Sequence, residues 1–358
     1  MNRRLMLRLL GFSTLAAFGS GAAITMLRKP KNPYHNGPVT DHFDGLRFFS
    51  PGRANFADKS RMDLLKWQFG GGNESWPGQF PSPFQDKPPQ RVEAGLRVTL
   101  VGHASYLIQT DALNILMDPV WSDRASPVSF AGPRRVNAPG ISLADLPKID
   151  AILLTHNHYD HMDVTTLSAL ANVHAPRIIT PLGNDAILTA ADPTLAPLLS
   201  VCDWGDSIAL SDRVMITLEP SLHWSARGIS DRFMALWGNF VITAPAGRIY
   251  ACGDTGYEPQ SIFPRMKAKY GGFRLALLPI GAYEPRWFMQ EQHMNPLEAV
   301  AVFKELGAES AIGHHWGTFK LTNEGIERPR EALAVALHEA GLEPGLFQAF
   351  LPGQVWEG

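Results

Sequence analysis

The sequence predicts an α/β domain that runs from residue 97 to residue 358 and follows an N-terminal extension. Stretches with helical spacing alternate with strand-like apolar runs as far as residue 317. Because no linker interrupts this mixture, we expect one layered domain rather than two. The first strand-like runs lie at residues 97–102, 105–110, 114–118 and 151–156.

Composition indicates a globular protein with a large core. Hydrophobic residues make up 45% of the 358 residues, charged residues make up 18%, and the net charge is −2. The sequence has no long runs of Lys and Arg that could bind the phosphate backbone of a nucleic acid, so we predict no nucleic-acid partner. The two cysteines, Cys202 and Cys252, are too few for a disulfide scaffold or a thiolate zinc site. We favour buried free thiols over a single bridge between them.

Residues 1–30 have the layout of a signal sequence. Arg3 and Arg4 precede an apolar stretch from Leu9 to Leu27, and further basic residues follow it. The paired arginines indicate the twin-arginine export route, which predicts a periplasmic protein in a bacterial cell envelope. An anchor in the inner membrane stays open, because the apolar stretch approaches the ~20 residues that span a bilayer.

Residues 31–96 are rich in proline, glycine and aromatic side chains, and we predict an extension that packs on the core. Within it, residues 58–69 have helical spacing and an amphipathic pattern. We favour a helix that covers the core, with a membrane-contacting face as the alternative. Asp163 is expected to cap a later helix, and Asn295, followed by Pro296, is expected to begin another.

The sequence THNHYDH has the composition of a metal-binding loop. It follows an unbroken apolar run, so the loop leaves the end of a buried strand. His156, His158, Asp160 and His161 supply four donors in six residues, and this spacing lets several side chains converge on one point. Imidazole and carboxylate donors suit zinc, iron or manganese. A merely solvated polar loop is disfavoured, because clustered histidines usually mark a metal site.

Further donors follow other predicted strands. His223, Asp254 and the pair His314 and His315 each stand at or just beyond the end of a strand-like run. Active sites of layered α/β folds collect at such strand ends. Together with the first four donors, these residues suffice for two adjacent metal sites that share one bridging carboxylate.

These motifs together resemble the metallo-β-lactamase superfamily and, within it, the N-acylphosphatidylethanolamine-hydrolysing phospholipase D family. The resemblance extends from about Gly102 to Glu324 and is carried by GHASYLIQTDALNILMDPVWSDRASPVSFAGPRR, THNHYDHMD, GDTGY, WFMQEQHMNPLEAV and HHWGTF. It implies an αββα four-layer sandwich with two divalent metal ions, for which the donors favour Zn²⁺. The implied ligands are His156, His158 and His223 on the first ion, Asp160, His161 and His315 on the second, and Asp254 bridging both. His315 is chosen over His314 because it immediately precedes WGTF.

The resemblance also implies a hydrolase that cleaves a phospholipid with an acylated amine head group into N-acylethanolamine and phosphatidic acid. Asp160 and Asp254 are the expected catalytic residues, because both are placed to orient the attacking hydroxide. Gln292 and His293 match a pair beside the active-site pocket of that family, and Tyr159 is a further candidate for substrate contact. The expected partners are phospholipid and the membrane surface, and a homo-oligomer is left open.

Two roles stay open for several other side chains. His103 and His314 are either histidines packed at strand ends or supports for the metal ligands. A set of large apolar residues suits either the core or an apolar groove for lipid: Trp224, Trp237, Trp287, Phe288 and Met289.

Three other functions compete with the lipid phosphodiesterase. A lactonase or carboxylic ester hydrolase on the same scaffold is the main alternative, because fold does not imply function. The segments WFMQEQHMNP and HHWGTF favour the phosphodiesterase over it. A diiron redox protein would need a flavin-binding partner domain, for which we find no room in 358 residues. A non-catalytic protein with a degenerate site is disfavoured, because all seven ligand positions are present.

Overall fold

The computed structural model describes residues 31–51 and 59–358. The predicted signal sequence at residues 1–30 lies outside this range. Within the described part of the chain, no helix has the length and apolar character needed to cross a bilayer.

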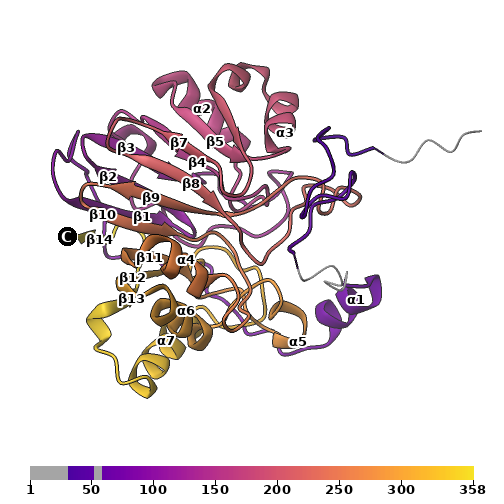
Figure 1. Cartoon of the computed structure of the whole chain (residues 1–358). Coiled ribbons are helices and arrows are strands. Elements are labelled where there is room, and N and C mark those ends of the chain that lie inside the picture. The colour runs from indigo at the N-terminus through magenta and orange to yellow at the C-terminus, as the bar shows by residue number, and fades with distance from the viewer. Residues whose placement is uncertain (1–30, 52–58) are drawn as a thin grey trace, which may run out of the picture. The chain divides into compact units, whose positions relative to one another are not determined.

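Two mixed β-sheets of seven strands each lie at the centre of the domain (Figure 1). The strands are β1 (Leu96–Gly102), β2 (Ser105–Thr110), β3 (Leu113–Met117), β4 (Ala151–Leu153), β5 (Arg177–Pro181), β6 (Leu199–Cys202), β7 (Ser207–Ala209), β8 (Met215–Glu219), β9 (Asn239–Ala244), β10 (Gly247–Ala251), β11 (Phe273–Pro279), β12 (Ala308–His314), β13 (Phe347–Ala349) and β14 (Val355–Glu357). The first sheet has the order β14-β1-β2-β3-β4-β5-β6, and the second has the order β13-β12-β11-β10-β9-β8-β7. In these orders, the first sheet has three antiparallel pairings followed by three parallel ones, and the second sheet has three parallel pairings followed by three antiparallel ones.

Helices cover the outer faces of both sheets (Figure 1). The α-helices are α1 (Arg61–Phe69), α2 (Val164–His174), α3 (Asn184–Ala191), α4 (Phe263–Tyr270), α5 (Arg286–Met289), α6 (Pro296–Leu306) and α7 (Arg328–Glu339), and short 3₁₀ helices span Leu143–Asp145, Pro193–Leu198 and Pro344–Leu346. Helices α2 and α3 pack on the first sheet, and α4, α6 and α7 pack on the second. The predicted αββα four-layer sandwich is therefore confirmed.

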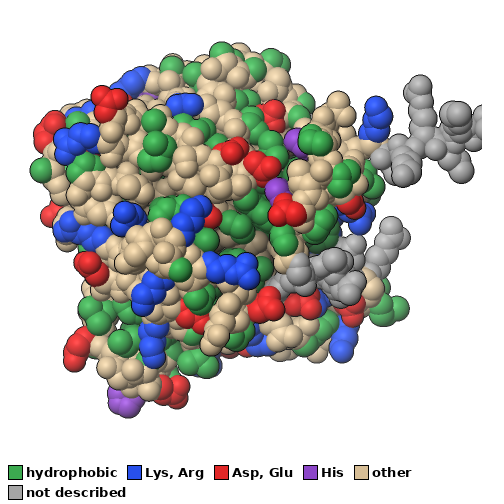
Figure 2. Space-filling model, in the orientation of Figure 1, with side chains coloured by type: hydrophobic (Ala, Val, Ile, Leu, Met, Phe, Trp, Pro, Cys, Tyr) green, Lys and Arg blue, Asp and Glu red, His purple; other side chains and the backbone are tan. Residues whose placement is uncertain are grey.

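The strands read as continuous apolar runs because both of their faces are buried. Along β3, Ile115 points into the core between the sheets and Leu116 points into the core under α2 and α3. Along β11, Leu277 and Leu278 divide in the same way between the central core and the core under α6. Figure 2 shows acidic and basic side chains interspersed over one face of the molecule, as the near-zero net charge leads one to expect.

Several local predictions are confirmed. The Asp163 side chain accepts a hydrogen bond from the Thr166 amide and caps α2. Asn295 caps α6 through a capping box with Glu298, and Pro296 is the first helical residue. Both cysteines are buried free thiols, as favoured.

The extension contributes to the core between the sheets. Phe43 and Phe48 are each 1% exposed, belong to that core, and have ring centroids 4.6 Å apart. Further along, Asp86 forms a bidentate ion pair with Arg97 of β1, with N–O distances of 2.7 and 2.8 Å. Residues Asn32–Gly358 accordingly form one unit.

Helix α1 is an exception to the expected burial. Ser60 caps it, and Trp67 stacks on Phe288 of α5 with ring centroids 5.0 Å apart. Met62 and Phe69, however, are 71% and 80% exposed. The expectation that this helix covers the core is wrong for these two side chains, because the helix touches its neighbours along one side only.

A histidine ties the extension to the segment between β6 and β7. The His42 ring lies between two carboxylates, with Nε2 2.7 Å from Asp203 and Nδ1 2.6 Å from Asp41. It also stacks on Trp204, with ring centroids 4.7 Å apart. The hydrogen bond to Asp203 raises the pKa of His42, burial lowers it by less, and Asp41 adds to the rise. The imidazolium form is therefore the one that the fold stabilises.

We predict that this contact makes stability depend on pH. Because the folded pKa of His42 lies above its unfolded value, the stabilisation is full below the unfolded pKa near 6.5 and is lost as pH rises through the folded pKa. The His42→Gln variant should lose about 2 kcal/mol at about pH 6 and much less at about pH 9. Urea unfolding of both proteins at the two pH values measures this. An equal loss at both values would contradict the assignment.

Candidate metal centre

The predicted donors meet where strands of the two sheets end side by side. The loops that follow β4, β8, β10 and β12 carry His156, His223, Asp254 and His315 respectively. Strand β4 belongs to the first sheet and the other three belong to the second. The site therefore joins the two halves of the sandwich.

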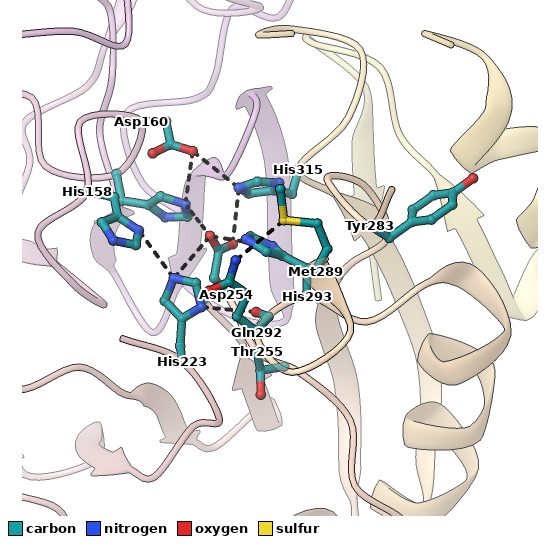
Figure 3. Close-up of polar contacts among 12 residues, drawn as sticks. His158, Asp160, His223, Asp254, Thr255, Tyr283, Met289, Gln292, His293 and His315 are labelled. Carbon is teal, nitrogen blue, oxygen red and sulfur yellow. Dashed lines mark hydrogen bonds and ion pairs between the residues drawn. The ribbon is translucent and has the colours of Figure 1, made fainter. Parts of the chain in front are cut away.

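The loop after β4 closes a tight turn. The backbone N–H groups of His161 and Met162 both donate to the carbonyl oxygen of His158, at 3.1 and 2.8 Å. The loop then ends at Asp163, which caps α2. Held at both ends in this way, four donors within six residues face the same centre. Figure 3 shows this convergence for His158, Asp160, His223, Asp254 and His315.

Three imidazole nitrogens form the first group of donors. His156 Nε2 lies 2.9 Å from His158 Nδ1, and His223 Nε2 lies 3.2 Å from the same atom. Asp254 Oδ2 stands 3.8 Å from His156 Nε2 and 3.6 Å from His223 Nε2. These four residues have ligand atoms within 4.8 Å of one another.

The second group of donors lies on the other side of Asp254. His161 Nε2 is 3.6 Å from Asp160 Oδ2 and 3.3 Å from Asp254 Oδ2. His315 Nε2 is 3.3 Å from Asp160 Oδ2 and 3.1 Å from Asp254 Oδ1. The Asp254 carboxylate thus faces both groups, and the structure brings all seven predicted ligand residues together.

Hydrogen bonds on the far side of the His223 and His156 rings orient them. The His223 Nδ1–H donates to the backbone carbonyl of Gln292 at 3.0 Å. The Thr155 hydroxyl, which donates to Asp118 at 2.6 Å, accepts from His156 Nδ1 at 2.9 Å. Each bond leaves Nε2 free to face the donor group.

Asp118 supports the site although no sequence motif points to it. Its Oδ2 accepts from His161 Nδ1 at 2.7 Å, and its Oδ1 accepts from the Thr155 amide at 2.8 Å. Its position directly after β3 was the available signal, since the other donors also follow strands. Asp118, His103 and His315 have positive φ values of 40°, 55° and 64°. Positive φ is uncommon for non-glycine residues, and such residues cluster at active sites.

The charges of the site are set by burial and by neighbouring carboxylates. Burial lowers the pKa of His158 to about 4 and that of His223 to about 3, so both rings are neutral. Burial also lowers the pKa of His315, but Asp254 and Asp160 outweigh it and raise that pKa to about 9. For Asp254 burial acts upward, and the surrounding histidines, His315 first, hold its pKa well below the usual range. The site therefore combines neutral imidazoles at His158 and His223 with an imidazolium at His315 and ionised carboxylates.

His103 and His314, whose roles the sequence leaves open, support the site in different ways. His103 Nε2 lies 2.9 Å from Asp160 Oδ2, and its ring packs 4.1 Å from that of His315. It also belongs to a group of candidate metal donors with Asp160, His161 and His315. The His314 Nε2–H donates to the Cys252 carbonyl at 3.0 Å, so His314 packs behind the site.

A cavity of about 470 Å³ opens onto the donors. His293 lines it, with Nδ1 3.9 Å from Asp254 Oδ2, and Gln292 lies beside it. Tyr159 also lines the cavity, but its hydroxyl donates to the Arg227 carbonyl at 3.0 Å and so is already engaged.

Apolar side chains form much of the cavity wall. Trp224, Phe288 and Met289 line it, whereas Trp237 is 1% exposed and belongs to the central core. Helix α1 contributes Leu64 and Trp67. No feature of the sequence indicates this contribution from α1, because no motif links the extension to the donors.

The donor set fits divalent metal ions. In the first group, ring nitrogens of His156 and His223 both approach the same nitrogen of His158, and at most one proton can lie between the two nitrogens of each contact. In the second group, imidazole nitrogens approach carboxylate oxygens. Within the described part of the chain, His161 Nε2, His315 Nε2 and Asp254 Oδ1 are buried and have no well-aligned hydrogen-bond partner. Buried polar atoms of this kind normally find a partner, and a metal ion is one that accepts both donor types.

Comparisons with known proteins agree with this geometry. A family model described as "Beta-lactamase superfamily domain" matches residues 113–316. N-acyl-phosphatidylethanolamine-hydrolyzing phospholipase D 1 of Caenorhabditis elegans is 37% identical over 278 residues, which cover 74% of this chain and 76% of that protein. The mitochondrial N-acyl-phosphatidylethanolamine-hydrolyzing phospholipase D of Saccharomyces cerevisiae is 33% identical over 250 residues, which cover 68% of this chain and 52% of that protein.

Solved structures show the same fold. The isothiocyanate hydrolase from Delia radicum gut bacteria superposes with a TM-score of 0.57 at 21% identity, and the match covers 73% of this chain and 100% of that one. Identity this low concerns the fold alone. The sequence identity to the worm protein, in contrast, extends over most of both chains. The chain is a metal-dependent hydrolase of the metallo-β-lactamase superfamily and belongs to its N-acyl-phosphatidylethanolamine-hydrolysing phospholipase D family.

Proposed function

We propose that the chain is a dinuclear phosphodiesterase of the phospholipase D type. It would hydrolyse N-acylphosphatidylethanolamine-like phospholipids to N-acylethanolamine and phosphatidic acid. The observation that carries this proposal is one cavity that exposes the buried His/Asp cluster on one side and apolar, aromatic side chains on the other. A phospholipid offers a charged phosphodiester and long apolar chains in the same molecule. The names of the worm and yeast relatives support this substrate class.

The seven donors divide between two metal sites in the proposal. His156, His158 and His223 would hold the first ion, Asp160, His161 and His315 would hold the second, and Asp254 would bridge them. Nitrogen and oxygen donors without thiolate suit Zn²⁺. Two bound divalent ions would supply Lewis-acid polarisation of a phosphoryl oxygen and a water of lowered pKa.

The side chains of the protein would orient the reactants. The Asp254 carboxylate faces both donor groups and would hold the attacking water, and Asp160, fixed by His103, would hold it from the second group. His293 and Gln292 would contact the head group from the cavity wall. Tyr159, the third predicted substrate contact, would act through its ring, since its hydroxyl is bonded to Arg227. A water nucleophile makes a serine or lysine nucleophile unnecessary, so no covalent intermediate is expected.

We predict that the protein hydrolyses phosphodiesters and not lactones. The metal-loaded protein should hydrolyse N-acylphosphatidylethanolamine and bis(p-nitrophenyl) phosphate and leave a sugar lactone intact, because the cavity combines phosphodiester and lipid features. Release of N-acylethanolamine and p-nitrophenol measures the first two activities. Turnover of the lactone alone would instead support the lactonase or carboxylic ester hydrolase alternative.

We predict that Asp254→Asn removes metal and activity together. Its two oxygens lie 3.1–3.8 Å from nitrogens of four histidines, so loss of the charge weakens both sites. The wild type should retain two ions per chain after dialysis and the variant one or fewer, with activity reduced at least about a hundredfold. Elemental analysis counts the ions. Asp123→Asn, which alters an exposed ion pair with Arg134, is the matched control. Full metal content and activity in Asp254→Asn would contradict the dinuclear assignment.

The membrane surface is the proposed partner. Helices α1 and α5, which line the cavity, also carry exposed apolar side chains. The exposed fractions are 71% for Met62 and 80% for Phe69 on α1, and 40% for Trp287 on α5. Apolar side chains so placed would enter the lipid interface and admit substrate from it. Residues 1–30 would direct the protein to a bacterial cell envelope, either into the periplasm by the twin-arginine route or as an anchor in the inner membrane.

We predict that the double variant Met62→Asp/Phe69→Asp binds phospholipid vesicles at least about tenfold more weakly, because burial of each apolar side chain contributes about 1.5–3 kcal/mol. Co-sedimentation with phosphatidylethanolamine vesicles measures the partition coefficient. Val335→Asp, at an exposed apolar position of α7, is the control. Equal partition of the wild type and the double variant would exclude α1 as a lipid contact.

A further inference from the structure

A separate cavity of about 320 Å³ lies between the N-terminal extension and the segment at residues 134–138. Gln79 lines it from the extension, and Arg134, Arg135 and Asn137 line it from the other side. It shares no lining residue with the cavity that opens onto the metal donors. In the described part of the chain no Asp or Glu lines it, so the two arginines give its wall a positive charge.

Arg135 is a buried cation, and part of its guanidinium has no partner. The residue is 9% exposed. Nη2 donates to the Val120 carbonyl at 2.7 Å, and Nε donates to the Ser122 carbonyl at 3.4 Å. Nη1 is buried and has no hydrogen-bond partner in the part of the chain that the structure describes. Burial lowers the pKa of Arg135 to about 10, against the opposing effect of Asp163 and Asp123, so the side chain stays charged at neutral pH.

Asn137 leaves the opposite kind of atom without a partner. Its Nδ2–H donates to the Gly317 carbonyl at 2.6 Å, and this bond fixes which end of the amide is the donor. Its Oδ1 is therefore the acceptor, and it is buried with no hydrogen-bond partner among the described residues. An unpaired buried polar atom costs about 1–3 kcal/mol. A donor and an acceptor of this kind on side chains of one cavity wall indicate a ligand that satisfies both.

Arg134 adds a second cation to the wall. Its Nε lies 2.9 Å from Asp123 Oδ2, but the two side chains are 67% and 62% exposed. An ion pair so exposed to water holds its members only weakly. The Arg134 guanidinium is therefore free to turn toward an anion in the cavity, where its planar fork matches the oxygens of a phosphate.

We propose that this cavity is a binding site for a phosphate monoester, supplied either by inorganic phosphate or by the head group of a lipid phosphate. The ionised oxygens of a monoprotonated phosphate accept from Arg135 Nη1 and from Arg134, and its P–OH group donates to Asn137 Oδ1. Sulfate and phosphodiesters lack this hydroxyl at neutral pH and so bind more weakly. The inference goes beyond the proposed function and does not depend on which substrate the metal centre cleaves.

The wall of this cavity is bonded both to the extension and to the loop that carries His315. The Phe80 amide donates to the Val136 carbonyl at 2.7 Å, and the Val136 amide donates to the Thr318 carbonyl at 3.0 Å. A phosphate bound at this place joins the extension to that loop. It therefore stabilises the folded chain by mass action.

Isothermal titration calorimetry of the metal-loaded full-length protein tests the site, with inorganic phosphate as the probe. Ala138→Asp adds a negative charge at an exposed position of the cavity wall and removes no side-chain hydrogen bond. The Kd of the phosphate in the cavity should rise about tenfold or more in this variant, because like charges repel. Arg135→Met, which removes the unpaired Nη1, should give at least the same loss. In the wild type, sulfate should bind this site about tenfold more weakly than phosphate, because it leaves Asn137 Oδ1 unpaired.

Controls separate the cavity from the metal centre and from folding. Phosphate bound at the metal centre is common to all variants, so only the difference from the wild type reports the cavity. Val335→Asp adds the same charge on α7 and should leave the Kd unchanged. Metal content and the Tm without phosphate show that each variant is folded. Equal phosphate binding by the wild type, Ala138→Asp and Arg135→Met would overturn the inference, because phosphate would then bind at the metal centre alone.

Vesicles distinguish the two sources of the phosphate. Co-sedimentation compares phosphatidylcholine vesicles with vesicles that also contain phosphatidic acid. If phosphatidic acid strengthens vesicle binding by the wild type but not by Ala138→Asp, the site takes a lipid phosphate. If the two proteins bind both kinds of vesicle equally while their Kd values for free phosphate differ, the site takes inorganic phosphate.

Discussion

The structure depends on a buried cluster of seven imidazole and carboxylate side chains that face one another. Transfer of such groups out of water is costly unless each finds a partner. Asp254 is 2% exposed and lies within 4 Å of nitrogens from five histidines, which meet part of this cost. No single strand can assemble this arrangement. It requires loops from both sheets, and the central core fixes the distance between those sheets.

Hydrogen bonds from surrounding residues fix the orientation of the clustered imidazole side chains. Asp118, directly after β3, orients His161, and the backbone of Gln292, in the segment between α5 and α6, orients His223. The Gln292 segment is itself held by Arg286, which forms a bidentate ion pair with Glu298, at 2.8 Å for both bonds, and donates to the His293 carbonyl. The donors are therefore constrained from behind, so the site is preorganised by the fold.

Sequence patterns predicted the parts of this protein whose signals are local. Apolar runs and helix caps indicate strands and helices because their causes lie within a few residues, and four donors stand within one heptapeptide. Asp118 lies 37 positions before Thr155, and no spacing rule connects them. The exposure of Met62 depends on which side of α1 meets its neighbours, which periodicity alone does not determine. Tyr159 lines the cavity, and only tertiary contacts direct its hydroxyl toward Arg227.

The metal donors and the side chains of the cavity wall come from different parts of the fold. The metal donors are carried by loops at strand ends, rigid and supported across both sheets, whereas the cavity wall is built from α1, α5 and the loop after β8. Residues of the wall, such as Leu64 and Phe288, can change without moving a donor. A fold organised in this way accommodates different chemistry on one frame, and the likeness to an isothiocyanate hydrolase is an instance of the same frame. The substrate of this chain is therefore to be sought in its wall, where apolar side chains lie beside the buried donors.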